Sequence, residues 1–151
     1  MWIKGKLSKD GRFWMVEFPE LDACTQGHNK AEAYEMAKDL LEGLAEAYGF
    51  DLDITVAPVE NDIILAGSEN KKDFVAFVLH RLRDAAGLTL EDVTQKLGAK
   101  SLNAYARYEQ GRSEPTVSKI EELVSAITDA PFAFYYGGAA VMKTAELAHS
   151  R

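Results

Sequence analysis

Apolar and polar residues alternate in the first part of the chain with the two-residue period of β-strands. Two such runs, over residues 2–7 and 12–18, flank Asp10-Gly11, a dipeptide typical of a tight hairpin turn. The second run has one apolar face, formed by Trp14, Val16 and Phe18. Pro19 ends the second strand, and a third, short strand is expected over residues 21–25. The pattern therefore predicts a hairpin with one added strand.

The spacing then changes to that of a helix. Asn29 and Glu32 are placed as in a capping box, and Gly49 suits a left-handed helix end. Apolar residues recur between these signals at three- and four-residue intervals: Ala33, Ala37, Leu40, Leu41, Leu44 and Tyr48. A last strand is expected over residues 62–66. The predicted order is β-β-β-α-β, with the helix packed on one face of the sheet.

Helical spacing continues through the second half of the chain. Gly87, Gly98 and Gly111 each end a helical segment, and Pro115 precedes the last one. This last helix is expected to turn five apolar residues inward: Val117, Ile120, Leu123, Val124 and Ile127. The pattern predicts four short helices in a compact bundle.

Three segments follow from this change of period. We expect an α+β domain over residues 1–67, an all-α helix-turn-helix bundle over 68–129, and a C-terminal tail over 130–151. The tail holds four aromatic residues in an uncharged run, which suits a dimerisation segment and equally suits closure of the bundle's own core.

Charge divides the chain at the same place. Residues 1–70 hold 14 Asp and Glu against 6 Lys and Arg, a net charge of −8, whereas residues 71–151 have a net charge of +1. An acidic surface repels the phosphates of nucleic acid, so contact with DNA is expected in the second half. Acidic residues on the first helix have the spacing of a solvated stripe.

The second and third of the four helices have the lengths of a helix-turn-helix and are joined by Gly98-Ala99-Lys100. In that motif the start of the second helix meets base edges in the major groove, and basic groups hold phosphates. The residues with fitting chemistry are Lys100, Ser101, Asn103 and Arg107, with Arg112 in the loop that follows. In the alternative interpretation, Ser101 only caps the helix and Arg107 only pairs with a neighbouring carboxylate.

Leu79 to Ile127 resembles a Cro/repressor-type (XRE-like) domain. The most specific match is the segment from Tyr105 to Thr116, which follows that family's pattern at the end of the recognition helix. The resemblance implies a sequence-specific, usually dimeric protein that binds operator DNA. The chain departs from the family at Leu90, where a polar, DNA-facing glutamine is common, and in the turn after Gly98, which is one residue longer.

The first half also resembles a known family. The hairpin, residues 18–28 (FPELDACTQGH) and Glu32-Ala33 are similar to the HicB antitoxin domain, a partial ribonuclease-H-like fold often followed by a DNA-binding domain. The resemblance implies the antitoxin of a type II toxin–antitoxin pair. Its acidic domain would cover the active face of a small, basic HicA-like ribonuclease toxin, and its second domain would repress the operon. The alternative is a standalone transcriptional regulator whose acidic module senses a ligand or mediates assembly.

Catalysis is not expected. A two-metal nuclease needs several converging carboxylates, and the hairpin offers only Asp10, in a turn, and Glu17. Cys24 and His28 are four residues apart, but a zinc site normally needs more ligands. We expect Cys24 to be a small, buried strand residue and His28 a loop residue, with no cofactor or metal. A metal-dependent nuclease is the third hypothesis.

The remaining expectations concern location and assembly. The longest uncharged run, residues 130–142, is far shorter than the roughly 20 apolar residues of a membrane helix. With one cysteine and no secretion signal at residues 1–6, the chain is expected to be cytoplasmic and to contact no membrane. A homodimer is expected, because helix-turn-helix proteins generally bind two half-sites, and pairing of dimers into a tetramer is left open.

Overall fold

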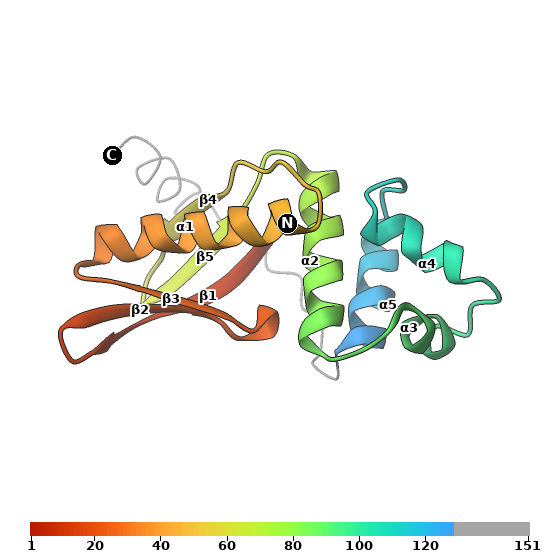
Figure 1. The fold of residues 1–151 in the computed structure, drawn as a ribbon, viewed down its shortest axis with the longest axis horizontal. Coiled ribbons are helices and arrows are strands. Elements are labelled where there is room, and N and C mark those ends of the chain that lie inside the picture. The colour runs from red at the N-terminus through yellow and green to blue at the C-terminus, as the bar shows by residue number, and fades with distance from the viewer. Residues whose placement is uncertain (129–151) are drawn as a thin grey trace. The chain divides into compact units, whose positions relative to one another are not determined.

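A computed structural model describes residues 1–128 of the protein. These residues divide into two compact units, residues 1–70 (unit 1) and residues 71–128 (unit 2) (Figure 1). The predicted tail over 130–151, with its candidate role in dimerisation, lies outside the described residues. The expected class, an α+β unit followed by a helical one, is confirmed.

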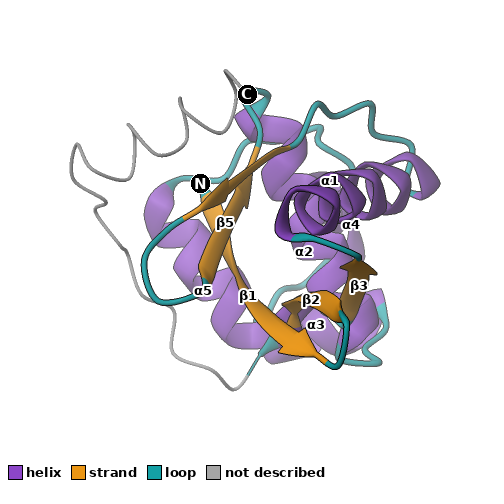
Figure 2. Ribbon diagram, turned by 90° about the vertical axis from the view of Figure 1, so that its left-hand side faces the viewer, coloured by secondary structure: helices purple, strands orange, loops and turns teal. Residues whose placement is uncertain are grey.

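Unit 1 is a five-stranded antiparallel sheet with the strand order β3-β2-β1-β5-β4. The strands are β1 (Trp2–Asp10), β2 (Phe13–Phe18), β3 (Ala23–Gly27), β4 (Thr55–Pro58) and β5 (Ile63–Gly67). The predicted hairpin is β1-β2, and Gly11 takes a left-handed φ of +57° in its turn. The helix α1 (Lys30–Ala47) lies in the hollow of the curved sheet (Figure 2).

The strand β4 was not predicted, and the sheet therefore ends in a hairpin, β4-β5, rather than in one strand. Its turn holds Asn61 and Asp62, whose φ angles of 61° and 59° are those of a primed hairpin turn. Asp62 was expected to open the last strand, which instead begins at Ile63. Four residues ending in a proline at a sheet edge carry too little alternation to be recognised.

The core of unit 1 lies between α1 and the sheet. The sheet contributes Leu7, Val16, Phe18 and Ile64, and α1 contributes Ala33, Ala37, Leu41 and Ala45. The small residues on α1 let it approach closely: a Cβ added to Gly27 would collide with the backbone nitrogen of Ala33. Three residues expected on the buried face, Leu40, Leu44 and Tyr48, are only partly covered.

Cys24 is exposed, which corrects the expectation that it is buried. Ala23 and Gly27 are buried on the α1 side of β3, so the two-residue period turns Cys24 to the opposite face, where its register partner is Glu17. The strand was correctly expected, but residue type alone assigned the cysteine to the wrong face.

Unit 2 has four helices within the described residues: α2 (Lys71–Ala85), α3 (Leu90–Lys96), α4 (Leu102–Glu109) and α5 (Val117–Ile127). Each contributes fully buried apolar side chains, among them Phe77, Val93, Tyr105 and Leu123. Val117 was expected to point inward and is 56% exposed. It follows the cap residue Thr116 directly, and the inward row of α5 becomes fully buried only at Leu123.

Candidate nucleic-acid interface

The geometry between α3 and α4 depends on how α3 ends. Gly98 adopts a left-handed φ of +63°, where a side chain would be strained. Its amide donates to Gln95 O (3.0 Å), and the amide of Ala99 donates to Thr94 O (3.1 Å). This pair of bonds is a Schellman motif, which closes α3 and turns the chain toward α4.

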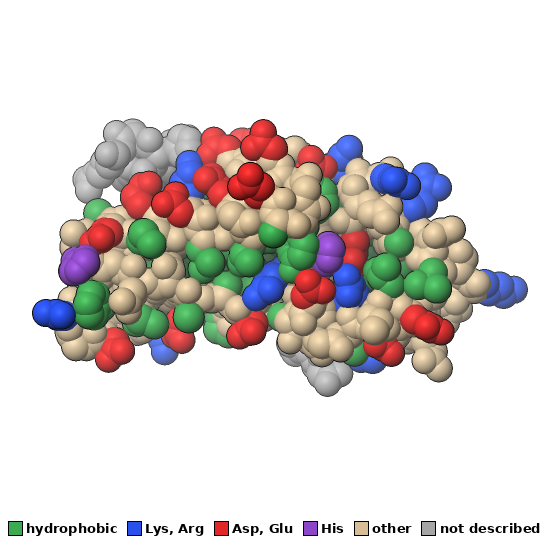
Figure 3. All heavy atoms as spheres, in the orientation of Figure 1, with side chains coloured by type: hydrophobic (Ala, Val, Ile, Leu, Met, Phe, Trp, Pro, Cys, Tyr) green, Lys and Arg blue, Asp and Glu red, His purple; other side chains and the backbone are tan. Residues whose placement is uncertain are grey.

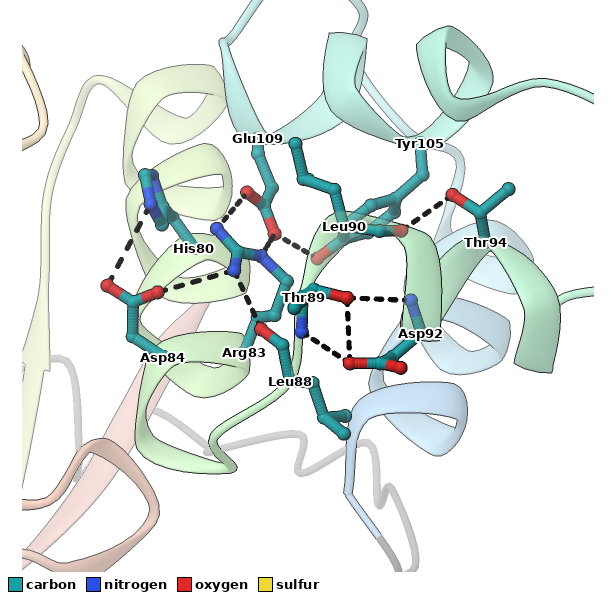
Figure 4. Close-up of polar contacts among 10 residues, drawn as sticks. All are labelled: His80, Arg83, Asp84, Leu88, Thr89, Leu90, Asp92, Thr94, Tyr105 and Glu109. Atoms are coloured by element: carbon teal, nitrogen blue, oxygen red, sulfur yellow. Dashed lines mark hydrogen bonds and ion pairs between the residues drawn. The ribbon is translucent and has the colours of Figure 1, made fainter.

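Both helices begin with a side-chain cap. Thr89 Oγ1 accepts from the amide of Asp92 (3.1 Å), and Asp92 Oδ2 accepts from the amide of Thr89 (2.7 Å) (Figure 4). The Thr89 hydroxyl also donates to Asp92 Oδ2 (2.7 Å). The two bonds that Asp92 accepts, first from the Thr89 amide and then from its hydroxyl, lower the pKa of Asp92. Ser101 Oγ accepts from the amide of Asn103 (3.3 Å), so Ser101 is the cap of α4.

The predicted contact residues lie on the surface of unit 2, along α4 and in the segments that flank it. Lys100, Ser101, Asn103 and Arg107 are all exposed, as is Arg112 in the next loop. Asn103 and Arg107 are one helical turn apart and therefore share a face of α4. A Lys or Arg side chain projects at the end of the unit where the α3–α4 turn lies (Figures 1 and 3).

Arg107 forms no ion pair with a carboxylate within residues 1–128, whereas His80, Arg83 and Lys119 of unit 2 each do. The loop after α4 begins with a second Schellman motif, in which the amide of Arg112 donates to Arg107 O (2.9 Å). The backbone thus ties both arginines to the same helix end.

Behind this surface, α4 is joined to α2 by a buried ion pair that the sequence analysis missed. Arg83 Nε and Nη2 donate to Glu109 Oε1 (2.7 Å) and Oε2 (3.1 Å), a bidentate arrangement (Figure 4). Tyr105 donates its hydroxyl hydrogen to the same carboxylate. Glu109 is 4% exposed. The available signal was the spacing of Tyr105 and Glu109, four residues apart on the inward face of α4.

The electrostatics of this cluster are those of paired, buried charges. Burial, followed by the negative charge of Glu109, raises the pKa of Tyr105 far above its usual range, so the phenol stays neutral. Burial opposes the positive charge of Arg83, but its bonds to Glu109 offset this and raise the pKa. Arg83 Nη1 also donates to Leu88 O (2.8 Å), which fixes the α2–α3 turn.

A family model described as a helix-turn-helix domain matches residues 75–128. The match takes in all five predicted contact residues, and it supports a DNA-binding transcription regulator. The comparison with curated proteins gives no match for the chain.

The other candidate residues lie in unit 1. Glu17 is the register partner of Lys6, four residues along β1 from Asp10, so the two carboxylates are separated by about 13 Å of strand. His28 Nδ1 lies 3.0 Å from Glu32, and its ring contacts Phe13. No group of three His, Cys, Asp or Glu residues in the described part of the chain could hold a metal ion. None of the helices within residues 1–128 is long and apolar enough to span a membrane.

Proposed function

We propose that the protein is a HicB-like antitoxin that neutralises a small, basic, HicA-like mRNA-cleaving toxin and represses its own operon. Neutralisation occurs by occlusion of the toxin's active face by unit 1, and repression by binding of operator DNA through unit 2. The observation that carries the proposal is the succession of an acidic α+β unit and a helix-turn-helix domain in one chain.

The segment that resembles HicB has a local structural role in unit 1, which supports the likeness in fold. Pro19–Leu21 forms a single 3-10 turn, closed by Asp22 in a left-handed conformation. β3 follows, and Gly27 ends it where α1 crosses closely. The residues of this segment therefore position α1 on the sheet, and we assign them no contact with the toxin.

Charge supports the proposed partner. α1 carries exposed acidic residues along its outer side, Glu35, Asp39 and Glu46, and acidic side chains gather on the α1 side of unit 1 (Figure 3). A ribonuclease must attract phosphates and therefore presents a basic face. Complementary charge accelerates association and makes it sensitive to salt.

The mechanism we propose is binding without catalysis, in the cytoplasm and with no bound cofactor. On DNA, two copies of the chain form a homodimer that binds two half-sites, and whether dimers pair into tetramers follows from operator spacing. The alternative function is a standalone regulator in which unit 1 senses a ligand or mediates assembly. It is favoured by the match in residues 75–128, which supports a DNA-binding regulator and requires no toxin.

Co-purification from native lysate tests the proposal, with tagged full-length protein and intact-mass analysis of the eluate. We expect a stoichiometric small basic protein that cleaves RNA once it is separated from the chain. Reversing three charges, with Glu35→Lys, Asp39→Lys and Glu46→Lys, should abolish this association. Glu91→Lys, Glu121→Lys and Glu122→Lys make the same change in net charge on unit 2 and should retain it. An eluate with DNA but no such protein favours the standalone regulator.

A further inference from the structure

An exposed leucine stands at the first position of α4. Leu102 is 46% exposed, although helical spacing puts it on the same row as Ala106 and Glu109, which are both buried. The buried face of α4 is thus covered by the core at Ala106 and Glu109 but is exposed at Leu102, the first residue of the helix. The residue therefore presents apolar surface that is open to a ligand.

The side chain is directed by helix geometry. Cα–Cβ bonds in a helix tilt toward its N-terminus, so Leu102 leans past the start of α4. Lys100, Ser101 and Asn103 are exposed at the same end. In helix-turn-helix domains this end of the second helix meets the base edges. Leu102 is thus the apolar member of an otherwise polar set.

Only one chemical feature of a base pair matches such a side chain in the major groove. Base edges there display hydrogen-bond donors and acceptors, apart from the C5 methyl group of thymine. A leucine placed against a polar edge would deprive that edge of water without replacing its hydrogen bonds. We propose that Leu102 contacts a thymine methyl group and thereby specifies a T·A pair in each half-site. This inference rests on the DNA-binding part of the proposed function and is independent of the toxin.

The chain offers a matched control for this residue. Val117 is likewise apolar, is the first residue of its helix, α5, and is 56% exposed. Because both residues are exposed at the first position of a helix, truncating either one to alanine should leave unit 2 folded. Only Leu102 lies at the start of α4.

The experiment uses the full chain and has two steps. Selection from random DNA duplexes first defines the preferred site of the wild-type protein. Each thymine of that site is then replaced in turn by deoxyuridine, which lacks only the methyl group. At one thymine position per half-site, this replacement should weaken binding about four-fold for the wild type and for Val117→Ala. Leu102→Ala should bind the two duplexes equally at that position.

A second variant changes the preference instead of removing it. Glutamine can bond to N6 and N7 of adenine, so Leu102→Gln should select adenine in place of that thymine and leave the other positions unchanged. Full thymine sensitivity in Leu102→Ala, or an unchanged site in Leu102→Gln, would overturn the inference while DNA binding stands. Failure of the wild type to select any sequence would overturn the DNA-binding function itself.

Discussion

The buried carboxylate of Glu109 has hydrogen-bond partners for both of its oxygens, which Arg83 and Tyr105 supply. A buried charge is tolerated only when it is paired and hydrogen-bonded, so these three residues depend on one another. Their arrangement also orients α4: the inward side is fixed by Tyr105 and Glu109, and Asn103 and Arg107 are left on the exposed side.

The ion pair gives the first prediction. Glu109→Gln leaves the Arg83 guanidinium with a neutral partner in a buried site, and we expect a loss of about 3 kcal/mol in the free energy of unfolding of unit 2. Asp84→Asn, which removes the more exposed partner of Arg83, should cost less than about 1 kcal/mol. Urea denaturation measures both values. Equal losses in the two variants would show that burial does not decide the strength of this interaction.

The exposed side of α4 gives the second prediction, which concerns DNA binding. Because Asn103 and Arg107 are outside the core, Asn103→Ala with Arg107→Ala should abolish binding to operator DNA and leave the midpoint of thermal unfolding almost unchanged. Lys71→Ala with Lys72→Ala, two exposed cations on α2, is the control and should retain sequence-specific binding. Gel-shift titration measures affinity, and retained binding in the first variant would remove α4 from the interface.

At the scale of elements, most helix and strand ends follow from short-range signals. The cap at Asn29 and the glycine ends of the helices are visible in the sequence because each depends on the residue at a single position. The missed features depend on tertiary neighbours. β4 is defined by its pairing with β5, and the exposure of Cys24 is set by the register of β3 on β2. The exposed positions of the candidate contact residues on α4 follow from helical spacing, whereas the Arg83–Glu109 pair required the packing of α2 on α4.

Replacing glycine by alanine should have opposite effects on stability at a helix end and in a helix interior. Gly98→Ala places a side chain at a φ of +63° and should destabilise unit 2 by about 1–2 kcal/mol. Gly43 lies within α1, where an added Cβ meets nothing within 4 Å, and Gly43→Ala should stabilise unit 1 by about 0.5–1 kcal/mol. Chemical denaturation compares the two. A stabilising Gly98→Ala would contradict the left-handed turn between α3 and α4.

The capping box of α3 predicts a pH dependence. The pKa of Asp92 is lower in the folded state than in the unfolded chain, so its contribution to stability is present above about pH 5 and is lost as pH falls through the lowered pKa. Asp92→Asn should therefore reduce the stability of unit 2 at neutral pH and flatten the acid limb of its stability profile. Denaturation at a series of pH values tests this, and an unaltered acid limb would place the titrating group elsewhere.

At the scale of the whole chain, charge and fold divide together. Unit 1 has a net charge of −8, and the positively charged candidate contacts Lys100, Arg107 and Arg112 all belong to unit 2. In the proposed function, binding of a basic toxin and binding of DNA therefore belong to different parts of one chain. An antitoxin that also represses its operon requires this separation, because a surface that attracts a basic protein repels DNA.

The neutralising role of unit 1 is tested by inhibition of the RNA-cleaving activity of the basic protein that we expect to co-purify. RNA cleavage by that protein is titrated with the wild-type chain and with the α1 charge-reversal variant. We expect a stoichiometric amount of the wild-type chain to inhibit cleavage completely. The variant should not inhibit cleavage, and both proteins should bind operator DNA equally. Undiminished cleavage in the presence of excess wild-type chain would contradict the antitoxin function.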